Sequence, residues 1–264
     1  MSAHDHHDHH DEYGETFVAG LEWMWGEGYL SPGGEAEVAR IVAGAPIEGA
    51  RVLDVGCGLG AIDVLLVERF GAAHVTGIDV EAPLVAKATA RVEAAGLADR
   101  VSIRMVAPGP FPFEDAAFDV VFSKDSMIHI PDKPALYDEV HRVLAPGGWM
   151  VVGDWFGNGL EPTPAMREWL DAVGLTFTLV SIEASAALAA ECGFVDVQWQ
   201  DRNAWYAETM VGEIAALSGE HYPHLVERLG AEAAAQRLES STKKKVVVDG
   251  GELRPGHLRA RRPP

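Results

Sequence analysis

From residue 51 onward, short apolar runs alternate with longer stretches whose apolar residues recur at helical spacing. The runs are rich in Val, Ile and Leu, which is typical of buried strands, and the stretches between them concentrate their apolar residues on one face. The expected strands cover 51–55, 74–80, 101–106, 118–123 and 149–155, and the expected helices cover 61–70, 82–95 and 133–144. Strands that alternate with helices in this way form a parallel sheet with helices on both faces. We therefore predict an α/β chain with a doubly wound, Rossmann-like sheet.

The pattern becomes less regular after Trp155. Helical spacing dominates 163–193 and 203–240, and apolar runs at 195–200 and 257–261 indicate a sixth and a last strand. Ligands bind at the carboxyl edge of such sheets. Because the second helical stretch precedes the last strand, we expect a helical cap at about 203–245 over this edge.

Two segments precede the first strand. Residues 1–12 are a polar tract that holds five of the eleven histidines. Such a tract is typical of a disordered tail, and binding of a divalent metal is the alternative. The next segment holds the aromatics Tyr13, Phe17, Trp23, Trp25 and Tyr29. We predict an N-terminal helical lid over 13–45 and one main domain over 46–264; a helix that only packs on the domain is the simpler interpretation of the lid.

Composition narrows the possible partners. The 264 residues carry a formal net charge of −19, so we expect no nucleic-acid partner, because phosphate binding needs a basic face. No apolar run approaches the ~18 residues of a membrane span, and no signal peptide opens the sequence. We therefore expect a cytoplasmic protein that contacts no membrane. Cys57 and Cys192 are far apart in the sequence, and we expect reduced thiols rather than a disulfide.

A glycine-rich loop joins the first expected strand to the first expected helix. The sequence LDVGCGLG holds Gly56, Gly58 and Gly60, and glycines allow a sharp turn and a close approach of the backbone to a ligand. Ala61 fits the alanine variant of the dinucleotide fingerprint, so the spacing leaves a dinucleotide open. Asp54, just before the loop, would repel a pyrophosphate and attract an ammonium group. An ordinary strand-to-helix turn is the other interpretation.

Asp79 ends the second expected strand in the sequence GIDV, about 20 residues beyond the loop. An acid at this edge of a sheet accepts the two hydroxyls of a ribose. The alternative is an N-cap for the following helix. Together, the glycine loop and this acid favour a nucleoside ligand.

These stretches resemble the motifs of a known superfamily. DVGCGLG with the following GID is similar to the first two motifs of class I S-adenosylmethionine-dependent methyltransferases, and FDVVFS and LAPGGWMVVGDW are similar to later ones. The resemblance implies a seven-stranded, mostly parallel sheet with a reversed last hairpin. It also implies S-adenosylmethionine as cofactor, S-adenosylhomocysteine as product, a methionine end over Gly56 and Gly58, and a ribose on Asp79. The other cofactor contacts that we expect from it are Asp54, Cys57, Val80, Ser123, Lys124 and, for the adenine, the backbone near Ala107.

A segment upstream of the core resembles a narrower group. WGEGYLSPGG, residues 25–34, is similar to the F-G-E-x-Y-x-S-x-G-G segment of phosphoethanolamine N-methyltransferases. The resemblance implies that this segment folds over the cofactor and that Leu30 and Ser31 touch it. It also implies that Tyr13 latches the site shut.

The residues after the fourth expected strand extend this resemblance. SKDSMIH, residues 123–129, is similar to the S-[RQ]-D-A-x-x-H sequence of the same group and of sarcosine/dimethylglycine methyltransferases. The resemblance implies that Asp125 and His129 form a general-base pair next to the cofactor. A neutral His129 would take the proton of an acceptor amine, and Asp125 would orient its ring. A solvated loop is the alternative for both residues.

The region after the fifth expected strand departs from the phosphoethanolamine group. Leu175 and Phe177 stand where that group has phosphate-binding arginine and tyrosine side chains, which disfavours phosphoethanolamine as the acceptor. The run Lys243–Lys245 is either a substitute source of positive charge or a solvated face. The residues that we expect around the acceptor are Tyr29, Trp155, Phe177, Trp205 and Tyr206, since aromatic faces attract ammonium groups. For each of them, packing in the core is the alternative.

We therefore predict an S-adenosylmethionine-dependent methyltransferase that methylates a small-molecule amine on nitrogen, with no metal at the site. Transfer to carbon or sulfur of a small metabolite by the same acid-base pair is the first alternative. A non-catalytic cofactor-binding module is the second.

Overall fold

The computed structural model describes residues 13–264, so the tail predicted for residues 1–12 and its metal-binding alternative lie outside the described residues. One seven-stranded sheet has the order β3-β2-β1-β4-β5-β7-β6. The strands are β1 (Arg51–Val55), β2 (His74–Asp79), β3 (Val101–Met105), β4 (Phe118–Lys124), β5 (Leu144–Gly157), β6 (Val195–Asp201) and β7 (Leu253–Arg261).

The direction of the strands confirms the predicted mostly parallel sheet with a reversed last hairpin. β1 to β5 pair in parallel, and β7 pairs antiparallel with both β5 and β6. The chain passes from β1 to β2 on one side and later returns to β4 on the other side of β1. Such a reversal of strand order opens a crevice at the carboxyl ends of the two strands that flank it, here β1 and β4.

Two strands are longer than their apolar runs predict. β5 begins at Leu144, directly after the preceding helix, and continues to Gly157 with a register shift against β4. β7 begins at Leu253, where it pairs with Gly157. Each strand has a long antiparallel partner in the other, so pairing rather than local composition sets both lengths.

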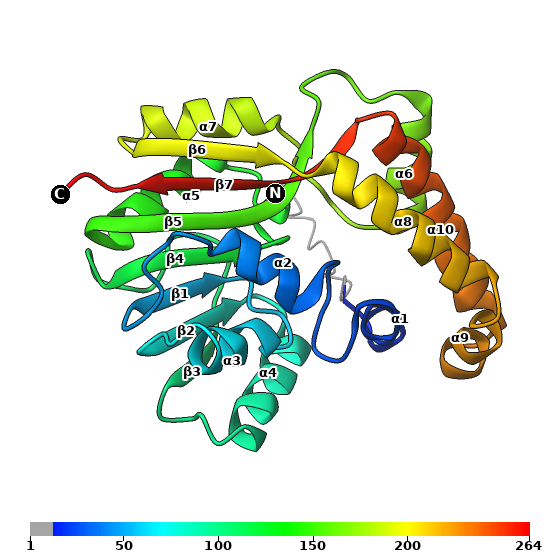
Figure 1. Cartoon of the computed structure of the whole chain (residues 1–264), viewed down its shortest axis with the longest axis horizontal. Helices are drawn as coiled ribbons and strands as arrows, with labels where there is room; N and C mark the ends of the chain where they lie inside the picture. The colour runs from blue at the N-terminus through cyan, green and yellow to red at the C-terminus, as the bar shows by residue number, and fades with distance from the viewer. Residues whose placement is uncertain (1–12) are drawn as a thin grey trace, which may run out of the picture.

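Helices cover both faces of the sheet (Figure 1). One face carries α2 (Gly34–Ile41), α3 (Ala61–Glu68) and α4 (Ala82–Ala94), and the other carries α5 (Lys133–Val143) and α7 (Ile182–Glu191). Each face has its own buried cluster, because successive side chains of a strand point to opposite sides. In β4, Val120 and Phe122 belong to the cluster under α2 and α3, and Val121 belongs to the cluster under α5.

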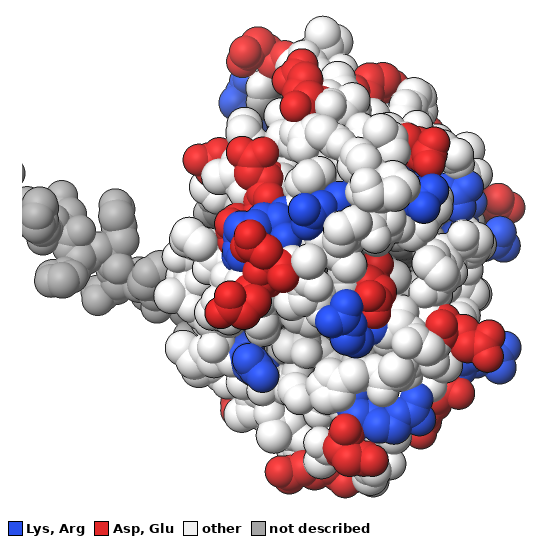
Figure 2. Space-filling model, turned by 90° about the vertical axis from the view of Figure 1, so that its left-hand side faces the viewer, with Lys and Arg blue, Asp and Glu red and all other residues white. Residues whose placement is uncertain are grey.

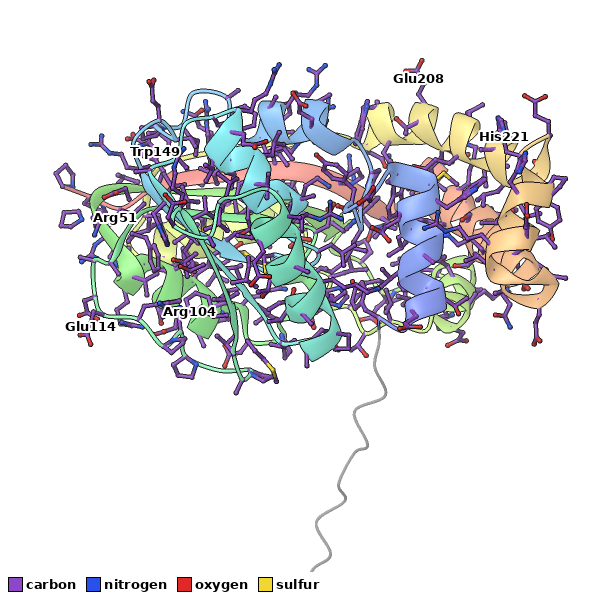
Figure 3. All side chains as sticks on the ribbon, turned by 90° about the horizontal axis from the view of Figure 1, so that it is seen from below. Arg51, Arg104, Glu114, Trp149, Glu208 and His221 are labelled. Carbon is purple, nitrogen blue, oxygen red and sulfur yellow. The ribbon has the colours of Figure 1, made fainter. Side chains whose placement is uncertain are left out.

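The remaining helices gather beyond the carboxyl ends of the strands (Figure 1). They are α1 (Glu15–Trp25), α6 (Pro164–Val173), α8 (Asn203–Ser218), α9 (Tyr222–Leu229) and α10 (Ala231–Asp249), and the short 3-10 turn η1 (Met127–His129) follows β4. Figure 3 shows the same division, with Arg51 of β1 and Glu208 of α8 in opposite halves of the molecule. A separate buried cluster, which includes Met166, Tyr206 and Val247, joins α6, α8 and α10.

The surface carries charges of both signs. Basic and acidic side chains are interspersed on the face that Figure 2 shows. Among residues 13–264, no helix is long and apolar enough to cross a membrane. That the chain binds no nucleic acid stays a prediction.

Candidate active site

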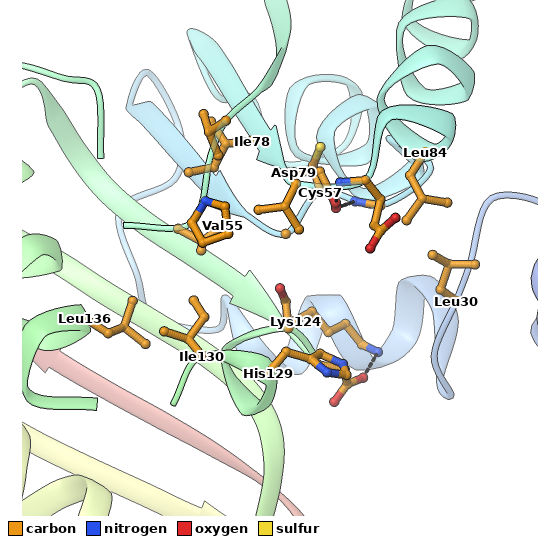
Figure 4. Close-up of a pocket in the computed structure, with 18 of the residues that line it drawn as sticks. Leu30, Val55, Cys57, Ile78, Asp79, Leu84, Lys124, His129, Ile130 and Leu136 are labelled. Atoms are coloured by element: carbon orange, nitrogen blue, oxygen red, sulfur yellow. Dashed lines mark hydrogen bonds and ion pairs between the residues drawn. The ribbon is translucent and has the colours of Figure 1, made fainter. Parts of the chain in front are cut away.

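A cavity of about 610 Å³ opens at the carboxyl ends of β1, β2 and β4 (Figure 4). Its size is within the ~300–1,000 Å³ of small-molecule sites. The predicted cofactor contacts that line it are Tyr13, Leu30, Ser31, Gly56, Cys57, Gly58, Asp79, Val80, Ala107, Lys124 and His129. The catalytic candidate Asp125 and the acceptor candidate Tyr29 line it as well. Segments from widely separated parts of the sequence thus meet where the strand order reverses.

Backbone conformation shapes the glycine loop between β1 and α3. Gly56 and Gly58 have φ of +77° and +55°, in the left-handed region that disfavours side chains. A Cβ on Gly56 would overlap the side chain of Ser126, and a Cβ on Gly58 would lie 3.1 Å from Leu30 Cδ1. The loop therefore needs glycine both for its turn and for the closeness of its neighbours.

Asp79 fixes this loop to the end of β2. Its Oδ2 accepts a hydrogen bond from the Gly58 N–H at 2.9 Å, and its Oδ1 accepts one from the Glu81 N–H at 3.0 Å. Burial raises the pKa of the Asp79 carboxyl, and the amide donors oppose the rise. Figure 4 shows the carboxylate beside Cys57 at the wall of the cavity. A carboxylate oxygen can accept more than one hydrogen bond, so the Asp79 carboxylate can still accept hydrogen bonds from the hydroxyls of a ligand.

Two predicted cofactor contacts lie within the sheet, outside the lining of the cavity. Ser123 is buried, and its hydroxyl donates to the Val55 carbonyl at 2.8 Å. Asp54 is buried beside Asp63 of α3. Its neighbours Leu53 and Val55 belong to the α5 face, so strand alternation directs Asp54 to the α3 face.

Asp54 and Asp63 form a buried pair of carboxyl groups beneath the glycine loop. None of their four oxygens has a hydrogen-bond partner in another residue of 13–264. Burial raises the pKa of both groups, that of Asp63 to about 7, because water no longer stabilises the charged form. The second acid of this pair was not expected from the sequence, where Asp63 appears as one polar position of a helix.

The ring of His129, at the end of η1, is contacted on both sides. Nδ1 lies 2.9 Å from the Thr176 carbonyl oxygen, and Nε2 lies 3.3 Å from the Tyr13 hydroxyl. A carbonyl only accepts, so Nδ1 carries the hydrogen of this contact, and Nε2 of the neutral ring keeps its lone pair. The ring can therefore accept a proton on the side of Tyr13. A backbone carbonyl leaves no signal in the residue pattern, and sequence reasoning missed Thr176.

Asp125 directly follows β4 and has a φ of +55°. Its carboxylate lies 2.7 Å from Lys124 Nζ, which also contacts the Ser31 hydroxyl and the Pro32 carbonyl. Lys124 thus joins Asp125 to the segment that precedes α2. The hydrogen bond that fixes Nδ1 of the imidazole goes to Thr176, whereas the sequence assigns the orientation of this ring to Asp125.

A smaller cavity of about 90 Å³ adjoins the first and shares Tyr13, Leu30, Ser31, Asp125 and His129 with it. Among the predicted acceptor contacts, Trp155, Phe177 and Tyr206 line this smaller cavity. Trp205 lines neither cavity, and its ring lies 4.7 Å from the Arg202 guanidinium carbon. Trp205 and Tyr206 are neighbours on α8, where successive side chains point about 100° apart, so only one of them faces the cavity.

The lysines of the run Lys243–Lys245 differ in their surroundings. Lys244 reaches into the smaller cavity, where its Nζ lies 3.9 Å from the Trp155 ring centroid. Its two neighbours pair with acids one helical turn away, Lys243 with Glu239 and Lys245 with Asp249. Burial lowers the pKa of Lys244 to about 8. The sequence left a solvated face open as one interpretation of this lysine run, and that interpretation is wrong for Lys244.

Two further charged residues of the smaller cavity were not expected from the sequence. Glu213 of α8 accepts hydrogen bonds from Trp25 Nε1 at 2.8 Å and from the Tyr206 hydroxyl at 3.0 Å. Arg237 of α10 lies with its guanidinium 5.5 Å from the Trp25 ring centroid. Its Nε is shielded from solvent and has no hydrogen-bond partner among residues 13–264.

A buried polar pair lies beneath η1. Lys133 donates from Nζ to the Met127 carbonyl, and Asp154 faces the Ile128 amide. Burial raises the pKa of Asp154 to about 8 and lowers that of Lys133. Both side chains therefore contact the backbone of the turn that carries His129.

Known proteins match this chain in sequence and in fold. A family model described as a methyltransferase domain matches residues 52–148. Phosphoethanolamine N-methyltransferase 1 of Arabidopsis thaliana is 30% identical over 203 residues, which cover 76% of this chain and 40% of that protein. Phosphoethanolamine N-methyltransferase 2 of Haemonchus contortus, solved with phosphomonomethylethanolamine and S-adenosylhomocysteine, has a TM-score of 0.87 at 23% identity, covering 96% of this chain and 59% of that one.

The reversed β7 and the glycine loop agree with the family match. The chain belongs to the class I S-adenosylmethionine-dependent methyltransferases. Another chain of similar fold is a putative sarcosine dimethylglycine methyltransferase from Galdieria sulphuraria, with a TM-score of 0.73 at 24% identity, covering 92% of this chain and 84% of that one. The matched part of this methyltransferase chain spans less than half the length of its Arabidopsis relative. The two solved structures show the shared fold.

Proposed function

We propose that the protein transfers a methyl group from S-adenosylmethionine to the nitrogen of a small-molecule amine. One observation carries the proposal: Tyr13 and His129 meet at the wall that the larger and the smaller cavity share. A proton acceptor at this wall can serve a molecule in the smaller cavity that reacts with one in the larger. The similarity to N-methyltransferases supports nitrogen as the methylated atom.

The larger cavity fits S-adenosylmethionine. Its loop bears glycines where a Cβ would overlap Ser126 or crowd Leu30, so backbone atoms form that wall. We assign the methionine end to Gly56 and Gly58, the ribose to Asp79 and the adenine to the backbone near Ala107. When bound there, the cofactor supplies an electrophilic methyl group on sulfur and leaves as S-adenosylhomocysteine.

The residues of the shared wall prepare the amine. An ammonium group has no lone pair, so it must lose a proton before its nitrogen can form the new N–C bond. His129 Nε2 takes this proton. In the resulting imidazolium both N–H groups have a hydrogen-bond acceptor: Nδ1–H donates to the Thr176 carbonyl, and Nε2–H donates to the Tyr13 hydroxyl or to the acceptor molecule. The negative charge of Asp125, which lines both cavities, favours the protonated ring.

Most of the rate enhancement comes from holding the nitrogen in line with the methyl group. Well-oriented reactants gain up to about 7–11 kcal/mol of the barrier from position alone. The small size of the acceptor cavity and the aromatic side chains of Trp155, Phe177 and Tyr206 supply this restraint. A base contributes about 10²–10⁴-fold in addition.

The test is transfer of a radiolabelled methyl group from S-adenosylmethionine to a panel of amines, thiols and carbon nucleophiles. We expect label in amines, a 10²–10⁴-fold loss of turnover in His129→Ala, and unchanged cofactor affinity by calorimetry. His74→Ala is a matched control, because His74 begins β2 at the opposite end of the sheet. Label only in thiols or carbon acceptors would favour the alternative nucleophiles. Cofactor binding without transfer to any class would refute the proposal.

A further inference from the structure

Two cations and two acids line the smaller cavity, and a third cation just outside its lining, Lys124, neutralises one of the acids. Lys244 and Arg237 face it from α10, and Glu213 faces it from α8. The other acid in its lining, Asp125, is already paired with Lys124 at 2.7 Å. Lys244 and Arg237 have no ion-pair partner within residues 13–264 that lies within 4.0 Å. One positive charge therefore remains without a counter-charge in a largely aromatic chamber.

Aromatic rings compensate these cations only in part. Lys244 Nζ lies 3.9 Å from the Trp155 ring centroid and 4.8 Å from that of Tyr206, and the Arg237 guanidinium lies over Phe17 and Trp25. A cation–π contact recovers less free energy than the desolvation of an ion costs. The depressed pKa of Lys244 reflects this deficit, because desolvation is the first cause of its shift. An anion between the two cations would restore the balance.

We propose that the acceptor is an amino acid-like zwitterion whose single carboxylate is bound by Lys244 and Arg237. This inference rests on the proposed function. The amine of such a molecule reaches His129 at the shared wall, while its carboxylate lies in the smaller cavity. The cavity is small, about 90 Å³, and it adjoins the larger cavity through the wall that carries His129.

The charge count selects a monoanion over a phosphate monoester. A carboxylate neutralises the one surplus positive charge, whereas a phosphate group of charge about −1.5 to −2 would leave negative charge in the chamber beside Glu213. A phosphate also has five heavy atoms and needs several charge-assisted donors. Leu175 and Phe177, which supply no such donors, line the same cavity.

The first experiment compares acceptors of matched size at saturating S-adenosylmethionine. Glycine, sarcosine and β-alanine carry the carboxylate, glycinamide and ethanolamine lack it, and phosphoethanolamine carries a phosphate. We expect kcat/KM for at least one amino carboxylate to exceed that of its counterpart without the carboxylate by 100-fold or more. Equal or better use of glycinamide, ethanolamine or phosphoethanolamine would overturn the proposal.

The second experiment replaces the two cations singly. In Lys244→Met and Arg237→Met, we expect KM for the preferred amino carboxylate to rise at least 10-fold, with the affinity for S-adenosylmethionine little changed. Lys243→Met is the matched control, since that lysine pairs with Glu239 outside the cavity. An unchanged KM in both variants would remove Lys244 and Arg237 from the site.

A binding measurement separates this inference from the proposed reaction. Calorimetry with the full chain saturated in S-adenosylhomocysteine reports carboxylate binding without turnover. Binding of glycine or sarcosine that both variants weaken, together with no methyl transfer to any nucleophile, would refute the reaction and retain the anion site. Methyl transfer to amines with no binding of amino carboxylates would refute the anion site and retain the reaction.

Discussion

The Tyr13 hydroxyl lies 3.3 Å from Nε2 of His129, a residue 116 positions later in the chain. The opposite ring nitrogen of His129 is held by the Thr176 carbonyl, which belongs to the segment between α6 and α7. Three separate segments thus define the position of one imidazole. The position of the proposed proton acceptor, His129, therefore depends on the position of Tyr13, which lies just before α1.

Tyr13→Phe removes the hydroxyl and keeps the ring, which contacts Phe17 edge to face at 5.8 Å between centroids. We expect turnover to fall about 10–100-fold, because a hydrogen bond to a charged group contributes about 1.5–3 kcal/mol. Cofactor affinity should change much less. Steady-state kinetics and calorimetry measure the two effects. Tyr222→Phe, on α9, is the control, and a Tyr13→Phe enzyme with parental turnover would contradict a role in holding His129.

The buried pair Lys133 and Asp154 provides a prediction on stability. Lys133 donates to the Met127 carbonyl and Asp154 contacts the Ile128 amide, so loss of either side chain leaves a buried backbone group of the turn η1 without its partner, which costs about 1–3 kcal/mol. We expect Lys133→Met and Asp154→Val each to lower the free energy of unfolding by about that amount, and the double variant to lose less than the sum. Urea denaturation of all four proteins gives the coupling energy. Additive losses would show that the two groups do not interact.

Local pattern predicts this sheet well because the signal for a buried strand lies within the strand itself. The motif residues could be placed for the same reason: Asp79 ends β2, His129 lies in the turn that follows β4, and parallel strands end at one edge of the sheet. β5 and β7 pair with each other, so the length of each strand depends on its partner and not on its own amino-acid composition. They could therefore not be predicted from one apolar run.

The parts of the site that sequence reasoning missed depend on helix phase or on backbone atoms. Lys244 differs from its neighbours only in the direction that α10 gives its side chain, which the cap as a whole determines. Thr176 acts through a carbonyl that every residue type carries. Asp54 was predicted as a cofactor contact from its distance to the glycines, but strand alternation turns it beneath the loop.

The glycine loop gives a prediction that separates a clash from backbone strain. Gly56→Ala places a Cβ on the side chain of Ser126 and holds a non-glycine residue at φ +77°. The strain alone costs roughly 1–2 kcal/mol. We expect Gly56→Ala to lose most of its affinity for S-adenosylmethionine and some thermal stability. Gly56→Ala combined with Ser126→Gly should recover the part of the loss that is due to the clash. Calorimetry and thermal unfolding measure this recovery. If the double variant recovers nothing, backbone strain accounts for the whole effect.

The carboxyl pair beneath the loop makes stability depend on pH. The pKa of Asp63 is about 7 in the folded chain and 3.8 for the free side chain. A group whose pKa is raised by folding stabilises the protein fully below its unfolded pKa, and this contribution disappears as the pH rises through the folded pKa. We expect the free energy of unfolding to fall between about pH 4 and pH 7 by up to roughly 4 kcal/mol from this group. Denaturant titrations across that range measure the slope.

Asp63→Asn isolates the contribution of this side chain, because the amide has a similar shape and does not titrate. The variant should lose stability less steeply with rising pH than the parent, although Asp154 still titrates in both. Asp119→Asn is the matched control: the pKa of Asp119 is lowered by Arg51, so its contribution is lost only as the pH falls into the acid range. Parallel stability curves for the parent and Asp63→Asn between pH 4 and pH 7 would mean that Asp63 is charged throughout in the folded protein.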